Sequence, residues 1–143
     1  MLKGISPLLS PELLKTIAEM GHGDELVIGD CNFPAESMGQ RVVRADGHAG
    51  TALLDAILAL FPLDQFVDAP VTLMDPNGGM EGDPPVWAEF KAIVEKHQPG
   101  TRFEAIDRFA FYDRAKKAYA VLSTGENALY ACIIIKKGCI LAP

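Results

Sequence analysis

The stretch Pro11–Asp30, PELLKTIAEMGHGDELVIGD, decides the fold because it carries a helix, a turn and a strand in succession. Ser10 and Pro11 form a helix start, with serine as the N-cap and proline at the first helical position, and apolar residues then recur at helical spacing. Gly21 ends this pattern. Glu25–Ile28 is a short apolar run, opened by a charge and closed by a glycine and an aspartate, as in a buried strand. The sequence therefore predicts a helix that leads through a short turn into a buried strand.

Helices and strands continue to alternate outward from this unit. Turn formers at Thr124–Asn127 favour a hairpin between the last two strands, and this pattern predicts one domain over residues 1–143, a three-layer α/β/α sandwich with a mixed sheet. The segments 31–40 and 75–84 are expected to be loops, and the second, dense in turn formers, is a candidate for function or mobility. Further strands are expected at 41–45, 71–74, 103–106, 118–123 and 130–135. Further helices are expected from a Thr51 cap to Phe61, from Trp87 until Pro99, and from an Asp107 N-cap through Lys117.

Composition excludes several classes of protein. With 143 residues, of which 49% are hydrophobic and 22% charged, the chain can bury a core without metal or disulfide support. A net charge of −6 gives no attraction to phosphate backbones or anionic lipid, so nucleic acid is not an expected partner. No apolar run approaches the roughly 20 residues that span a bilayer. Three cysteines without a C-x-x-C pair, and no leader pattern, predict a reduced, cytoplasmic protein.

Two residues of the opening stretch are candidates for chemistry. His22 lies between two glycines, which permit positive φ and close approach of a ligand to the backbone; the alternative is a turn histidine beside a helix terminator. Asp30 follows the first buried strand, and ligands of open α/β sheets bind beyond the carboxyl ends of strands. Its alternative is a turn aspartate that bonds its own backbone.

Two further candidates, Arg108 and Tyr130, are single polar residues beside apolar segments, and taken alone each is better interpreted as a structural hydrogen-bonding residue. A Gly21-x-Gly23 dinucleotide motif is rejected because its glycines precede the strand. A zinc site at His22 lacks the usual three or four ligands, and Cys31 lacks a visible base for nucleophilic catalysis. The remaining basic residues near strands are expected on solvated faces, namely Arg41, Arg44, Lys136 and Lys137.

Several segments together, PLLSPELLKTIAEMGHGDELVIGD, NFPAESMG, EGD, DRFAFYDRAKKAYA and YACIIIKKG, resemble the RbsD/FucU family of sugar mutarotases over nearly the whole chain. The arginine-containing segment is more similar to the fucose branch than to the ribose pyranase branch. The resemblance implies an RbsD-like fold and anomer interconversion without cofactor or metal. It also implies ring-shaped homo-oligomers, typically decamers, with sites at subunit interfaces.

The same resemblance assigns roles to four residues. His22 matches the family's catalytic proton donor, Asp30 and Arg108 match sugar-binding residues, and Tyr130 matches the tyrosine that opens the last binding strand. Opening a pyranose removes the anomeric hydroxyl proton while the ring oxygen gains one, and an imidazole suits both transfers near neutral pH. The glycines beside His22 would give the sugar access to the ring.

The chain departs from the family pattern after this tyrosine. The family often continues as Tyr-Gly-Asn, whereas Ala131 and Cys132 stand here in the expected sugar-binding segment. Strand periodicity predicts that Cys132 shares the face of Tyr130, and a thiol is a weaker hydrogen-bonding group than an amide. Relaxed selectivity at one sugar hydroxyl is therefore expected; the alternative is that Cys132 packs in the core.

The leading hypothesis is therefore a mutarotase acting on the α and β anomers of a monosaccharide, with L-fucose as first choice. Three alternatives stay open: a D-ribose pyranase, a non-catalytic sugar-binding component of an uptake system, and a metal-dependent isomerase. Loss of activity on chelation would select the last of these.

Overall fold

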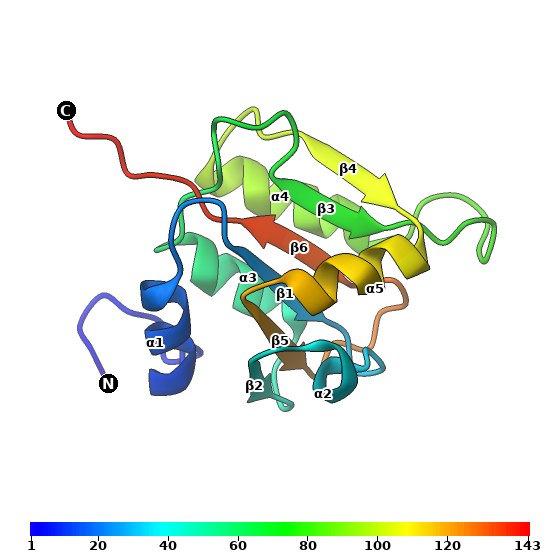
Figure 1. Ribbon diagram of the computed structural model, residues 1–143, viewed down its shortest axis with the longest axis horizontal. Coiled ribbons are helices and arrows are strands. Elements are labelled where there is room, and N and C mark those ends of the chain that lie inside the picture. Colours follow the sequence, from blue (N-terminus) through cyan, green and yellow to red (C-terminus); the bar gives the residue numbers. More distant parts are fainter.

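A computed structural model describes residues 1–143 as one six-stranded sheet with helices on both faces (Figure 1). The strand order is β2-β5-β1-β6-β3-β4. Five strands share one direction, and only β6 runs antiparallel, between β1 and β3. The carboxyl ends of the five parallel strands therefore meet at one edge, where β6 begins. The strands are β1 (Glu25–Gly29), β2 (Val42–Ala45), β3 (Val71–Met74), β4 (Phe103–Ile106), β5 (Ala120–Thr124) and β6 (Ile133–Lys136).

Helices form a layer on each side of the sheet, as Figure 1 shows with α5 in front and α3 and α4 behind. Successive strand residues point to opposite faces. Leu26 and Ile28 accordingly pack in the core shared with α1, α3 and α4, while Val27 packs in the core shared with α2 and α5. The predicted three-layer α/β/α sandwich with a mixed sheet is confirmed. The helices are α1 (Pro11–Glu19), α2 (Ala35–Met38), α3 (Gly50–Leu58), α4 (Val86–His97) and α5 (Arg108–Lys117).

Two predicted helix starts are confirmed in atomic detail. The Leu13 N–H donates to Ser10 Oγ at 3.1 Å, and the Asp107 carboxylate accepts the N–H groups of Phe109 and Ala110 at 2.9 and 3.0 Å. Each cap satisfies donors that the first helical turn leaves without a partner. Each cap thereby fixes where its helix begins.

The predicted hairpin between the last two strands is wrong, because β1 lies between β5 and β6. The segment between them crosses the end of β1 instead, where the Cys31 N–H donates to Glu126 O at 2.9 Å. A turn motif in the sequence predicts a local bend but not which strands pair. Pairing here depends on the burial of the apolar β1 between two equally apolar strands.

Other boundaries also differ from the predictions. A short helix, α2, lies within the expected loop at 31–40, where Phe33 and Ala35 are buried. Helix α3 has Ala49 as its N-cap, two residues before the predicted Thr51 cap, and ends at Leu58, three residues before the predicted Phe61. The last strand begins at Ile133 and not at residue 130. No helix is long and apolar enough to cross a bilayer.

Candidate active site

The edge formed by the carboxyl ends of the strands carries a buried carboxylate. Asp30 directly follows β1 and is 9% exposed. Its Oδ1 accepts the Asn32 N–H at 2.9 Å, the turn geometry that sequence reasoning offered as its alternative role. Burial raises the pKa of Asp30 above its usual value, because desolvation outweighs the Asn32 N–H and the Cys132 thiol, both of which favour the ionised form.

Cys132 lies beside Asp30, immediately before β6. Its side chain is 2% exposed and packs in the α5-side core. Burial raises the pKa of this thiol, and the neighbouring Asp30 charge adds to the effect. The thiol therefore stays protonated and can donate toward Asp30. The predicted strand periodicity that put Cys132 on the face of Tyr130 is wrong, since both residues precede β6.

Tyr130 adopts a left-handed backbone conformation, with φ of 57°. Such a conformation is costly for a bulky residue and concentrates at functional sites. Its phenol lies against the loop that follows β3: a Cβ added at Gly79 would overlap Tyr130 Oη. Glycine at position 79 therefore lets the tyrosine ring lie directly on the loop backbone. The loop expected at residues 75–84 is confirmed, and it reaches one of the candidate residues.

Arg108 opens α5, immediately after β4 at the same edge of the sheet. Its side chain is exposed, and its guanidinium lies 4.8 Å from the ring centroid of Phe109. It makes no hydrogen bond or ion pair within the chain. One strand, β3, separates β4 from β6 in the sheet, so Arg108 lies at the same edge as Asp30 and Tyr130 but makes no hydrogen bond with either.

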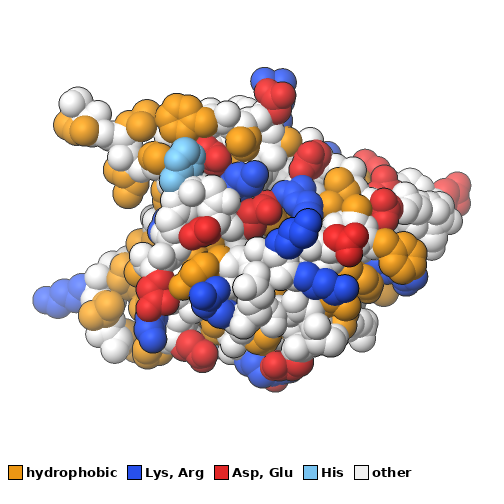
Figure 2. Space-filling view, in the orientation of Figure 1, with side chains coloured by type: hydrophobic (Ala, Val, Ile, Leu, Met, Phe, Trp, Pro, Cys, Tyr) orange, Lys and Arg blue, Asp and Glu red, His pale blue; other side chains and the backbone are white.

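His22 lies at the opposite edge, in the turn before β1, with 47% of its side chain exposed. Its Nε2 is 3.1 Å from Oδ1 of Asp64, a side chain only 3% exposed. Asp64 Oδ1 also accepts the Phe66 N–H at 3.0 Å, and the Phe66 ring centroid is 5.6 Å from that of His22. Figure 2 shows a histidine among hydrophobic and acidic side chains near the C-terminal tail.

The pairing with Asp64 assigns the proton on the neutral His22 ring. A carboxylate only accepts hydrogen bonds, so Nε2 carries the hydrogen and Nδ1 is left as the free acceptor. The buried partner fixes both the tautomer and the direction of the ring, as second groups do for catalytic and metal-bound histidines. This imidazole is thus half-exposed, oriented and able to exchange a proton at Nδ1.

The two edges are far apart within one chain. His22 precedes β1 and Asp30 follows it, so the five-residue strand separates them by about 16 Å, at about 3.3 Å per residue. Asp30, Tyr130, Ala131 and Cys132 are brought together at one edge, and Arg108 lies at the same edge beyond β3. His22 and Asp64 lie at the other edge.

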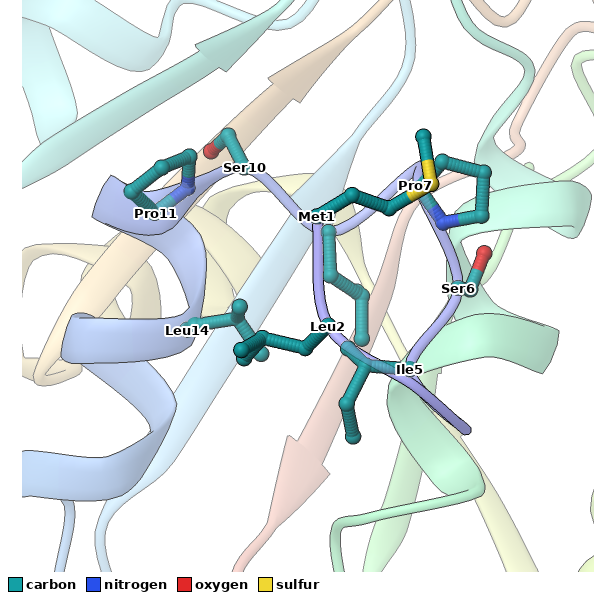
Figure 3. A pocket seen from close by; sticks show the side chains of 9 residues that line it. Met1, Leu2, Ile5, Ser6, Pro7, Ser10, Pro11 and Leu14 are labelled. Carbon is teal, nitrogen blue, oxygen red and sulfur yellow. The ribbon is translucent and has the colours of Figure 1, made fainter.

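An apolar recess lies elsewhere again. It measures about 350 Å³ and lies between the N-terminal segment and α1, lined by residues such as Leu2, Ile5 and Leu14 (Figure 3). None of the candidate residues lines it. Nor do any three histidine, cysteine or carboxylate side chains converge as a metal ion would require. The chemistry-bearing groups therefore lie on open edges of the sheet and not in an enclosed cavity of the single chain.

Comparison with known proteins places this geometry in a family. A model of the RbsD / FucU transport protein family matches residues 3–140. The chain belongs to this family. It is 55% identical over 139 residues to an L-fucose mutarotase from Actinobacillus pleuropneumoniae serotype 5b (strain L20), covering 96% of each chain. The Streptococcus pneumoniae fucose mutarotase, solved in complex with L-fucose, matches with a TM-score of 0.92 at 44% identity, covering 98% of this chain and 100% of that one.

The wider RbsD/FucU fold also extends to a more distant relative. Bacillus subtilis RbsD complexed with D-ribose matches with a TM-score of 0.71 at 21% identity, covering 99% of this chain and 100% of that chain. That likeness shows a shared fold alone. The RbsD-like fold and the family expected from the sequence segments are both confirmed.

Sequence reasoning missed two features of this RbsD/FucU chain. Asp64 gave no signal, because it lies in an irregular segment between α3 and β3 and its role depends on a contact 42 residues away. Lys137 was expected on a solvated face, which is wrong: its Nζ donates to the carbonyl oxygens of Ile17 and Met20. A lysine directly after an apolar strand gives no sign in sequence of which backbone it will reach.

Proposed function

We propose that the protein is a sugar mutarotase that interconverts the α and β anomers of L-fucose. The observation that carries this proposal is the 55% identity, over nearly the full length of both chains, to a relative that bears that name. The geometry supplies groups suited to the chemistry: an oriented imidazole at His22, and a carboxylate, a guanidinium and a phenol at Asp30, Arg108 and Tyr130.

The reaction needs one proton removed and one delivered. In the ring-closed sugar the anomeric hydroxyl loses its proton, the bond from the anomeric carbon to the ring oxygen breaks, and the ring oxygen is protonated. His22 Nδ1, free because Nε2 is held by Asp64, is the proposed site of proton exchange with the sugar. Rotation about the bond to the resulting aldehyde, followed by the reverse transfers, closes the ring as the other anomer. No cofactor or metal is part of this proposal.

Asp30, Arg108 and Tyr130 are proposed to grip the sugar hydroxyls. The guanidinium offers a fixed fork of donors, and a carboxylate can accept two hydroxyl donors. Ala131 and Cys132 complete this segment. Because both side chains are buried, Ala131 is proposed to contribute its backbone, and Cys132 to act on the sugar through Asp30.

The separation of His22 from Asp30 supports a site shared between two copies. Exposed apolar side chains occur at both edges: Phe66 and Ile140 beside the His22 edge, and Phe109 and Leu129 beside the Asp30 edge. Two different surfaces that complement each other give a head-to-tail contact, which closes into a ring when the rotation permits. We propose a homo-oligomer of this kind, a decameric ring, in which His22 and Asp64 of one copy face Asp30, Arg108 and Tyr130 of the next.

The same proposal covers the setting of the enzyme. We propose a single mutarotase domain over residues 1–143 that acts in the cytoplasm on monosaccharides in carbohydrate metabolism. The three free cysteines are consistent with a reducing compartment.

Magnetisation-transfer NMR of equilibrated L-fucose tests the function. The protein should accelerate exchange between the two anomeric proton signals while leaving their ratio unchanged. Exchange equal to that of buffer alone would contradict the proposal. Catalysis of D-ribose but not L-fucose would select the pyranase alternative, and L-fucose binding by calorimetry without exchange would select a non-catalytic sugar-binding protein.

A further inference from the structure

The pairing of His22 with Asp64 joins two irregular segments that are distant in sequence, and neither segment has regular structure of its own to hold it. One is the turn from Met20 to Asp24; the other is the segment from Pro62 to Gln65. Both border the same three residues, Lys136–Gly138, where the chain leaves the end of β6. What holds these segments decides whether the two side chains meet.

Lys137 binds the His22 turn through its backbone. The Gly23 N–H donates to Lys137 O at 2.8 Å, and the Lys137 N–H donates to Asp24 O at 2.9 Å. Lys137 thus bonds two successive residues, the pattern of a β-bulge whose first residue is a glycine with positive φ, and Gly23 has a φ of 88°. The two residues that follow His22 are thereby fixed to the end of β6.

The Lys137 side chain binds the residues that precede His22. Its Nζ donates to Ile17 O at 2.7 Å and to Met20 O at 2.5 Å. Carbonyl groups in the last turn of a helix lack helical partners and attract cations, and α1 has no basic residue in its own last turn. Lys137 supplies that cation from another element. The turn that carries His22 is therefore held on both sides by one residue.

Gly138 holds the Asp64 segment from the opposite side of the same strand end. The Gly138 N–H donates to Pro62 O at 2.8 Å, and the Asp64 N–H donates to Lys136 O at 2.9 Å. A Cβ at Gly138 would lie 2.5 Å from Leu63 O and 2.7 Å from Asp64 Cα.

The segment beside Gly138 has little freedom to move away from an added Cβ. The side-chain amide of Gln98 clamps both backbone groups of Leu63 at 3.0 Å. An alanine at position 138 would therefore have to push against backbone that is fixed on its far side, and the Asp64 carboxylate would be displaced with it.

We propose that Lys137 and Gly138 are positioning residues that fix His22 against Asp64. Lys137 binds the turn around His22, and Gly138, which has no Cβ, leaves room for the Asp64 backbone. This inference rests on the proposed function for its catalytic consequence but not for its structural one. Neither residue touches the sugar in this account; both act through the ring orientation and tautomer of His22.

The test uses the full-length protein and five variants, with His22→Ala as a sixth for signal assignment. Lys137→Met removes the ammonium, Lys137→Arg restores a cationic donor, and Gly138→Ala adds the Cβ. Lys136→Met is the matched control, because the Lys136 side chain makes no hydrogen bond or ion pair. Gly47→Ala is the control for glycine replacement, since a Cβ there meets open space.

Two readouts are measured on each folded variant. Nitrogen-15 NMR of histidine-labelled protein at alkaline pH reports the His22 tautomer, assigned with His22→Ala. Anomer exchange of L-fucose reports kcat and KM separately. Lys137→Met and Gly138→Ala should lose the preference for the Nε2–H form and lower kcat on the order of 10²-fold, since a misplaced catalytic group costs about that much. KM should change little, and Lys137→Arg should recover most of both readouts.

Single-tautomer spectra and kcat values that match the two controls, in folded Lys137→Met protein, would overturn the inference. If Gly138→Ala does not fold, Lys137→Met with its arginine rescue still decides. If the wild-type protein does not exchange L-fucose anomers, the proposed function fails, and the tautomer readout still tests whether these residues orient His22.

Discussion

Replacement of Asp64 by asparagine is expected to slow anomer exchange while leaving sugar binding intact. Asparagine keeps the size of the buried side chain and can still accept the Phe66 N–H, which lies 3.0 Å from the present Oδ1. Its amide nitrogen can only donate, however. An amide directed at His22 Nε2, now 3.1 Å from the carboxylate, would stabilise the wrong tautomer and put the hydrogen on Nδ1.

The size of the effect follows from the bond that is lost. A hydrogen bond to a charged group contributes about 1.5–3 kcal/mol, and each 1.36 kcal/mol is tenfold in rate. The Asp64→Asn protein should therefore show kcat lowered roughly 10- to 150-fold. Magnetisation transfer on L-fucose gives kcat, and calorimetry gives Kd, which should change little because the buried Asp64 side chain acts through His22 and does not touch the sugar. Wild-type kcat in the folded variant would refute the role assigned to the pair.

Four further outcomes are expected. His22→Ala should lower the exchange rate by about 10²-fold, the usual contribution of a positioned acid or base, in a protein that still folds because the half-exposed side chain adds little to the core. An unchanged rate in the folded variant would leave His22 a turn residue. Gly79→Ala should lower the exchange rate, because the added Cβ pushes Tyr130 Oη away. The same substitution should lower the rate less in the Tyr130→Phe protein, which lacks that oxygen, and an equal loss in both proteins would contradict the contact. Cys132→Asn should lower the melting temperature, since an amide in a 2% exposed position costs about 1–3 kcal/mol when unpaired; a sharper preference for L-fucose over D-ribose and galactose at an unchanged melting temperature would instead support direct sugar binding. The Thr72 hydroxyl donates to Glu104 Oε1 at 2.7 Å, and with Arg114 it holds the pKa of Glu104 below 4.5. The carboxylate therefore contributes stability above pH 4.5, and this contribution is lost as pH falls through the folded pKa. Glu104→Gln should reduce the urea-unfolding free energy at pH 7 and change it little in strong acid, and an equal loss at both pH values would refute this.

The local features of the fold were open to prediction from sequence. The Ser10 and Asp107 caps and the apolar run of β1 depend on neighbours within a few residues, and each lies where the pattern placed it. The pairing of strands, by contrast, depends on residues that are distant in sequence. The turn at Thr124–Asn127 predicted a hairpin, yet the chain crosses β1 there, because the exclusion of water from the apolar β1 is a property of the whole sheet.

The candidate site likewise contains residues that local sequence predicted and residues that it did not. His22 and Asp30 were recognisable because glycines flank one and a buried strand precedes the other. Asp64 and Lys137 were not, since the first acts across 42 residues and the second reaches helix carbonyl groups 117 and 120 residues away. Contacts of that range leave no periodic pattern in the sequence.

Complementation between two inactive variants tests the shared site most directly. His22→Ala removes the proton-exchanging group at one edge of the sheet, and Asp30→Asn removes the carboxylate at the other. When the two variants are co-expressed or refolded together, a head-to-tail ring with random order pairs an intact His22 edge with an intact Asp30 edge at about one quarter of its contacts. The mixture should therefore exchange L-fucose anomers at about one quarter of the wild-type rate, which neither variant approaches alone. A mixture no more active than the two variants measured separately would contradict a site built from two copies of the chain.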